Sequence, residues 1–407
     1  MKRKILCLTI ICLLAANQAR GSGFRIPEQS VNSVGMAGGY IANAHGPDAS
    51  YFNPANMAWN KNNWQIETSL NYINLPAIDY RDYRAQEYNG SSESENFLVP
   101  LIHLVSKDIN SFRFGFSLTS PFGLSKRWGD PFPAATARKF ELEVYEGNPS
   151  LSYKFNDHFA VAAGIRFIYA KGEIKNSSSL FRRDMEGDTT EWGYNLALSY
   201  RPMKTWNISA TYRSQVDLEM EGDASLIARH PLEGTLASYN GGSRVEVVTP
   251  AVYTLSTSIT LKQATMTLTW DRTFWSDYEQ LDFNYDKSFI NHPYFHNFDA
   301  PVAKNWENTD AFRIAFSYKN TERLTTMMGI AFDEEPIPEA TLDFELPDSD
   351  SVIYSIGFRY RTSDNMEIGF AYLYDDKEER SVDNSRLNGK FDRGGAHIVN
   401  TGLIYAF

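Results

Sequence analysis

The chain has 407 residues and a formal net charge of −11, with 50 acidic and 39 basic side chains. An acidic chain without a block of basic residues is not expected to bind nucleic acid. Aromatic residues make up 14% of the sequence although the mean hydropathy is −0.40. A polar average that hides many aromatic residues is typical of membrane-spanning strands, because these alternate lipid-facing and interior positions.

Residues 1–21 predict a secretory signal peptide. Residues 2–4 are basic and residues 5–16 are apolar, and this apolar core is too short to cross a bilayer as a helix, which takes about 20 residues. Ala19-Arg20-Gly21 places small residues where a signal peptidase reads them, so we expect cleavage before Ser22. Both cysteines of the chain lie in this segment. The mature chain is therefore expected to hold no disulfide and to have a net charge of −15.

Residues 22–63 show neither the period of a strand nor that of a helix. They hold several glycines, among them Gly35 and Gly38, and include Asn53-Pro54-Ala55. Glycine permits backbone conformations that other residues rarely adopt. We predict that this segment is a plug, or hatch, inside a barrel formed by residues 64–407.

From residue 64 on, amphipathic strands follow one another. In the first of them Trp64 and Leu70 fall on one face, and Glu67 and Asn71 fall on the other, which is the period of a strand. Most of the predicted strands approach the roughly ten residues that a tilted membrane strand needs. The predicted strands are 64–72, 97–106, 112–119, 140–154, 159–171, 190–201, 206–219, 249–261, 264–275, 307–318, 324–333, 351–362, 365–377 and 396–407.

The connections between these strands alternate between short and long. This alternation is typical of a bacterial outer-membrane barrel with tight periplasmic turns and longer extracellular loops. The fold class is therefore all-β, a 14-stranded antiparallel transmembrane barrel with both termini in the periplasm. The long connections are 74–96, 120–139, 172–189, 220–248, 276–306, 334–350 and 378–395.

Several charged residues fall on the face opposite the aromatic residues. We expect them to lie inside the barrel, where water or the plug satisfies them. They are Arg166, Arg201, Arg213, Arg313, Arg359, Arg361, Glu67 and Glu367. The chain ends in Tyr405-Ala406-Phe407, which resembles the signal that the bacterial barrel-assembly machinery reads.

The order of several short motifs resembles the FadL family, the outer-membrane transporters of long-chain fatty acids and aromatic hydrocarbons. The resemblance covers essentially the whole mature chain. Its motifs are Ser22-Gly23-Phe24-Arg25-Ile26, Gly35-Met36-Ala37-Gly38, Asn53-Pro54-Ala55, Asn148-Pro149-Ser150-Leu151-Ser152-Tyr153, Asn305-Trp306-Glu307-Asn308-Thr309 and the stretch 329–338. It implies passive uptake of a hydrophobic ligand, which extracellular loops capture, an apolar pocket holds and the wall releases sideways after a hatch shift.

The family has a kink in its third strand that opens a gap in the barrel wall. Here Pro121, Phe122 and Gly123 lie at that place, and Gly123 matches the kink glycine. Proline cannot donate a hydrogen bond to a sheet and glycine marks a bulge or bend. The other interpretation is that these residues only end strand three and begin a loop.

The resemblance also bears on the ligand. Loop 276–306 contains Phe283, Phe289 and Phe295, which either collect an apolar solute or pack together and roof the barrel. The family's best-known members have a longer loop after strand five and a basic residue near the ligand carboxylate. Here Asn176 takes that position, with Lys171 and Lys175 nearby. The ligand is thus a fatty acid or a neutral, for example monoaromatic, hydrocarbon.

Other classes of function fit the sequence less well. A general porin would share the barrel but lack the plug. An outer-membrane enzyme would need a nucleophile or acid pair with a base, and none of the seven histidines lies in such a motif; His292 and His296 lack the further ligands of a metal site. We expect no enzymatic activity, metal or cofactor, and a monomer among outer-membrane lipid and lipopolysaccharide.

Overall fold

The computed structural model describes residues 23–407, so the predicted signal peptide and its cleavage site lie outside the described residues. Fourteen antiparallel strands form a closed barrel, as predicted. Within residues 23–407 no helix is long and apolar enough to cross a membrane. The barrel strands are β1 (Gln65–Leu75), β4 (Glu95–Val105), β5 (Phe112–Thr119), β7 (Lys139–Lys154), β8 (Phe159–Ser177), β9 (Phe181–Met203), β10 (Trp206–Arg213), β13 (Ala251–Leu261), β14 (Ala264–Phe274), β18 (Thr309–Lys319), β19 (Leu324–Asp333), β20 (Ser351–Arg361), β21 (Met366–Lys377) and β24 (Gly395–Ala406).

The barrel closes between its first and last strands. β24 pairs with β1 from Gln65 opposite Ala406 to Asn74 opposite His397, so neither the first nor the last strand is left as a free edge. The alternation predicts the two faces of the wall correctly: Glu67 and Asn71 point inward and are buried, whereas Leu70 and Tyr72 are exposed on the outside.

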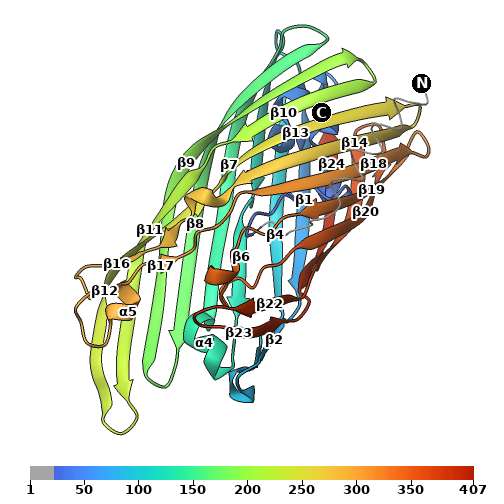
Figure 1. Cartoon of the computed structure of the whole chain (residues 1–407). Helices are drawn as coiled ribbons and strands as arrows, with labels where there is room; N and C mark the ends of the chain where they lie inside the picture. The colour runs from blue at the N-terminus through green and yellow to red at the C-terminus, as the bar shows by residue number, and fades with distance from the viewer. Residues whose placement is uncertain (1–22) are drawn as a thin grey trace.

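The two ends of the barrel differ (Figure 1). One end, which we name the terminal end, carries the short turns between strands and the backbone pair of Trp64 with Phe407. The opposite end, the loop end, carries the longer connections. Small sheets and helices fill these connections: β2 (Asp79–Asp82), η3 (Gln86–Tyr88), β3 (Gly90–Ser91), α4 (Pro131–Ala137), η4 (Trp275–Asp277), β15 (Gln280–Leu281), β16 (Phe283–Tyr285), α5 (His296–Asp299), β17 (Val302–Ala303), η5 (Glu339–Thr341), β22 (Arg380–Asp383) and β23 (Asn388–Phe391).

Two of the predicted long loops are wrong. Residues 172–189 belong to β8 and β9, which meet in a turn at 178–180, and residues 220–248 belong mostly to β11 (Val216–His230) and β12 (Gly234–Thr249). These strands extend β10 and β13 and project far beyond the rest of the loop end (Figure 1). Their outward residues, such as Glu173 and Glu221, are charged rather than aromatic. The aromatic alternation that revealed the other strands is therefore missing here.

The N-terminal segment, Gly23–Asn63, lies inside the barrel toward the terminal end (Figure 1). It forms α2 (Val31–Gly35), η1 (Ile41–Asn43), α3 (Ala49–Phe52) and η2 (Pro54–Trp59), most of which are buried. α2 packs against β20, β21 and β24. At β19 the wall is so close that a Cβ on Gly329 would lie 2.3 Å from the carbonyl carbon of Met36. Glycine at this position is what allows the segment to seat against the wall.

Charged residues of the inner wall are paired with one another and with the N-terminal segment. Arg313 donates to Asp271 (2.9 Å), to Asp333 (2.8 Å) and to the Ala37 carbonyl (3.1 Å). Arg359 likewise donates to Glu67 (2.7 Å). Such pairing compensates the cost of burying charge, and the bonds from Arg313 to Ala37 and from Arg359 to Asn32 (2.9 Å) fix the segment to β18 and β20.

Candidate functional site

The wall is interrupted beside the third barrel strand. β4 pairs with β5 only from Ile102 opposite Leu118 to Val105 opposite Gly115. The chain then passes through Ser120–Phe122 and continues as β6 (Gly123–Arg127), which pairs with β7 but not with β4. Residues 95–101 of β4 therefore have no strand partner on this side within the described chain. We name this interruption the side opening.

The sequence of the third strand explains why its pairing with β4 stops. Three residues, Ser120 to Phe122, lie opposite only two residues of β7, between the pairs Thr119 with Glu146 and Gly123 with Glu143. An extra residue on one strand is a bulge, which bends that strand. Pro121 adds to the effect because it has no backbone N–H to donate.

The N-terminal segment replaces the missing strand partner at the bulge. The Ile26 amide donates to the Pro121 carbonyl (2.8 Å), and the Gly123 amide donates to the Phe24 carbonyl (3.0 Å). The side chain of Gln29 adds two bonds to the backbone of Ser120: its Oε1 accepts from the amide and its Nε2 donates to the carbonyl, both at 2.8 Å. The bulge and residues 24–29 thus satisfy each other's buried backbone groups.

A cavity of about 310 Å³ lies behind this docked segment. Its walls include inward-facing Ile73 and Leu142, and also Leu98 and Tyr145, which are 65% and 40% exposed on the outer surface. A single cavity that touches both faces of the wall passes through the side opening. Gly123 lines it as well.

Charged side chains also line this cavity. Lys377 is paired with Asp348, whereas Oε1 of Glu28 has no hydrogen-bond partner among residues 23–407. Burial raises the pKa of the Glu28 carboxyl to about 7, and the Arg313 guanidinium opposes this rise. Lys126 reaches the cavity from β6 and is 5% exposed.

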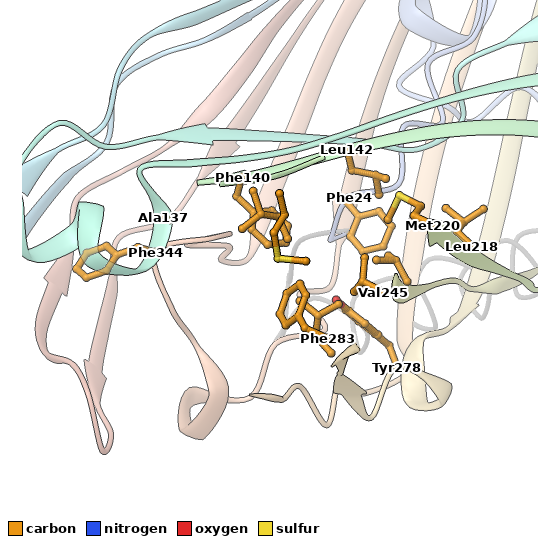
Figure 2. Close-up of a cluster of buried hydrophobic side chains, with 14 of the residues drawn as sticks. Phe24, Ala137, Phe140, Leu142, Leu218, Met220, Val245, Tyr278, Phe283 and Phe344 are labelled. Atoms are coloured by element: carbon orange, nitrogen blue, oxygen red, sulfur yellow. The ribbon is translucent and has the colours of Figure 1, made fainter. Parts of the chain in front are cut away.

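Phe24 lies where this cavity meets two smaller ones. Its ring packs on Trp275 at a centroid distance of 4.7 Å and on Trp306 at 5.6 Å. A space of about 40 Å³ on the other side of Phe24 is walled by side chains such as Met220 and Val245. Figure 2 shows Phe24 among Leu142, Met220 and Val245. Phe24 therefore separates an apolar space toward the loop end from the cavity at the side opening.

The residues predicted for the hatch all lie inside the barrel and contact different parts of its wall. Asn53 donates to the hydroxyls of Ser199 and Ser209, each at 2.9 Å. Pro54 begins η2, and the Ala55 carbonyl accepts a bond from the wall. Gly38 has a φ of +72° and lies against Arg313, and Gly35 packs against β20 and β21. These residues hold the segment to the barrel at some distance from the side opening.

The residues predicted to contact the ligand lie elsewhere. Lys171 and Lys175 are on the outward face of β8, where Lys175 pairs with Glu173, and they do not line the cavity. Alternation along β8 turns them outward because Ile168, Ala170 and Ile174 are the buried residues.

Three aromatic residues of loop 276–306, Phe283, Phe289 and Phe295, are each 1% exposed. Phe289 packs on Phe295 at 5.4 Å and on Tyr239 of β12 at 5.0 Å, and Phe283 packs under Arg183 at 4.3 Å. Phe283, Phe289 and Phe295 therefore pack within the loop-end core rather than lining the cavity.

Sequence reasoning missed Gln29 and Lys126. A lysine two residues after Leu124 could have been placed inward by alternation, because Leu124 and Lys126 lie opposite inward Leu142 and Phe140. No comparable signal marks Gln29, whose partner lies 91 residues away.

Comparison with known proteins agrees with this architecture. The model of the outer membrane protein transport protein family (OMPP1/FadL/TodX) matches residues 12–407. The long-chain fatty acid transport protein of Escherichia coli O6:H1 is 24% identical over 98% of each chain, and outer membrane protein P1 of Haemophilus influenzae is 23% identical over 90% of this chain and 88% of that one.

Solved structures show the same fold. A Pseudomonas aeruginosa FadL homologue superposes with a TM-score of 0.83 at 19% identity, covering 95% of this chain and 100% of that one. The toluene transporter TodX of Pseudomonas putida gives 0.71 at 16% identity, covering 96% and 99%. The chain therefore belongs to the FadL/TodX family of outer-membrane transport proteins, which carry hydrophobic compounds and are not enzymes.

Proposed function

We propose that this protein takes up long-chain fatty acids or similar hydrophobic compounds passively and releases them sideways through the side opening. The observation that supports this most is the single cavity that runs from Phe24 and Ile26 inside the barrel to Leu98 and Tyr145 on its outer surface. In this proposal the loop end is extracellular and both termini are periplasmic. Residues 22–63 form a hatch within the barrel of residues 64–407.

Sideways release has a clear energetic reason. Each methylene gains ~0.8 kcal/mol when it is buried away from water. A chain of about fourteen methylenes would thus lose roughly 11 kcal/mol if it were released into water. Passage from the cavity directly into the hydrocarbon of the membrane avoids this loss.

The hatch controls release because it occupies the inner edge of the opening. Residues 24–29 bond to both sides of Pro121, so a shift of these residues would widen the passage. Captured compounds enter from the loop end and pass Phe24 to reach the cavity at the side opening. The buried residues Phe283, Phe289 and Phe295 shape the loop that covers this entrance.

A neutral monoaromatic hydrocarbon is the alternative ligand. The toluene transporter shares the fold, and the apolar residues around Phe24 would suit either compound. We further propose that the protein acts as a monomer within lipid and lipopolysaccharide, and that the barrel-assembly machinery recognises its end at Tyr405 and Phe407.

Two measurements test the proposal. Cells that depend on this protein for uptake should accumulate radiolabelled palmitate, and toluene uptake is measured beside it. In planar bilayers the intact protein should show no large steady ion current, because Gly23–Asn63 fills the barrel. Large steady currents without uptake of either compound would instead support a general porin.

A further inference from the structure

Lys126 is a buried lysine at the side opening, and its place follows from the local ladder. β6 pairs Leu124 with Leu142 and Lys126 with Phe140. Leu142 and Phe140 are buried on the inner face, so Lys126 also points inward. It is 5% exposed and lines the cavity.

Lys126 differs from the other cations of this cavity because it has no partner. Arg25 lies 3.7 Å from Asp271, and Lys377 is paired with Asp348. By contrast, no hydrogen bond or ion pair joins the side-chain ammonium of Lys126 to another group of residues 23–407. Its ammonium is thus open to the cavity and shielded from bulk water, so an anionic group from outside the chain would be stabilised beside it.

Along β4, the residues near Lys126 are polar toward the loop end and apolar toward the terminal end. At the edge nearest the loop end, Glu95 accepts from Ser125 at 2.6 Å and lies 3.3 Å from Arg127. One carboxylate oxygen of Glu95 is therefore engaged, whereas its Oε2 has no hydrogen-bond partner among residues 23–407. The charges of Glu95 and Lys377 act on Lys126 at longer range. Farther along β4, toward the terminal end, Phe97, Leu98 and Val99 line the same cavity. The β4 side of the opening is thus charged at Glu95 and apolar from Phe97 to Val99.

We infer that Lys126 binds the carboxylate of an amphiphilic ligand whose hydrocarbon chain lies against Leu98 and Val99. This inference rests on the proposed function and narrows its ligand to an organic acid. An ammonium and a carboxylate in a site shielded from water form a strong charge-assisted hydrogen bond. The ligand then leaves with its head group toward the loop end, which matches the orientation of a lipid in the outer leaflet.

The test compares two ligands of equal chain length that differ in head group. Dissociation constants of radiolabelled palmitate and hexadecanol are measured by equilibrium dialysis on the full mature chain in amphipol, against amphipol alone. The variants are Lys126→Met, Lys126→Gln and Lys126→Arg. Lys171→Met, on the outward face of β8, is the matched control. Heat-modifiable migration on gels verifies that each variant is folded.

Loss of the charge in Lys126→Met or Lys126→Gln should weaken palmitate binding roughly 10- to 100-fold, since a hydrogen bond to a charged group is lost. Hexadecanol binding should change less than about twofold. Lys126→Arg and Lys171→Met should bind palmitate like the wild type. Equal palmitate affinity in the wild type and both uncharged variants would overturn the inference while leaving hydrophobic uptake intact. An equal loss for palmitate and hexadecanol would also overturn it, and a wild type that binds neither compound would overturn the proposed function itself.

Discussion

Gln29 is the residue whose replacement most directly loosens the hatch from the side opening. Its amide accepts from the Ser120 N–H and donates to the Ser120 and Ile26 carbonyls. The change Gln29→Met keeps the length of the side chain but removes these bonds. Both backbone groups of Ser120 then lose a partner in a buried place.

Leaving a buried polar group unsatisfied costs about 1–3 kcal/mol. For the two groups of Ser120 we expect ~2–4 kcal/mol, because water in the adjacent cavity can hydrate one of them in part. Since ~1.4 kcal/mol is a factor of ten, the population with residues 24–29 undocked should rise by roughly 30- to 700-fold.

Hydrogen exchange followed by mass spectrometry measures this population. The amides of Ile26 and Gly123 bridge the docked segment and the bulge, so their exchange should accelerate by that factor. The matched control is Gln215→Met, which removes an exposed side-chain bond to Asp217 (2.8 Å) and should leave both amides protected. Unchanged protection of Ile26 and Gly123 in the Gln29 variant would refute the assigned role of Gln29.

Three further substitutions test other parts of the structure. Gly123→Val adds a branched side chain at a position that lines the cavity in the side opening and narrows the passage, so palmitate uptake by cells should fall while the amount of barrel at the surface stays the same; normal uptake at equal surface level would contradict this. Gly329→Ala would bring a Cβ within 2.3 Å of Met36 and should lower stability by about 1–3 kcal/mol, seen as a lower heat-modification temperature; Gly147→Ala, whose Cβ would lie 3.9 Å from its nearest neighbour, is the control and should show no such loss. Phe289→Ala removes a buried ring at a cost of about 3–5 kcal/mol, and faster proteolysis of loop 276–306 should follow; an equally resistant loop would argue against the packing described.

The barrel could be predicted because aromatic residues alternate along most of its strands. Where the wall leaves the hydrocarbon, as in β11, outward positions become charged residues such as Glu219 and Glu221. The period of two persists there, with Val216, Leu218 and Met220 inward, but no aromatic residue marks the outer face. The strand extensions were therefore missed.

The side opening illustrates what local sequence can and cannot reveal. Pro121 and Gly123 pointed to a broken ladder, because their backbone properties are independent of the rest of the chain. The docking of Gln29 on Ser120 depends on two segments 91 residues apart, which no period or motif links. The outward placement of Lys171 follows from alternation alone and was available from the sequence.

The central claim is that ligand leaves the barrel sideways, and a bulky group in the side opening tests it most directly. Both cysteines fall within residues 1–21, so the predicted mature chain accepts single-cysteine labelling. Leu98→Cys places a thiol in the opening, and Ile356→Cys places one on the lipid-facing side of β20, away from the cavity. Each variant is labelled with a bulky thiol reagent, and palmitate uptake is measured in cells that depend on this protein. Sideways release predicts that the label at Leu98 abolishes uptake and the label at Ile356 does not; equal uptake by both labelled proteins would contradict it.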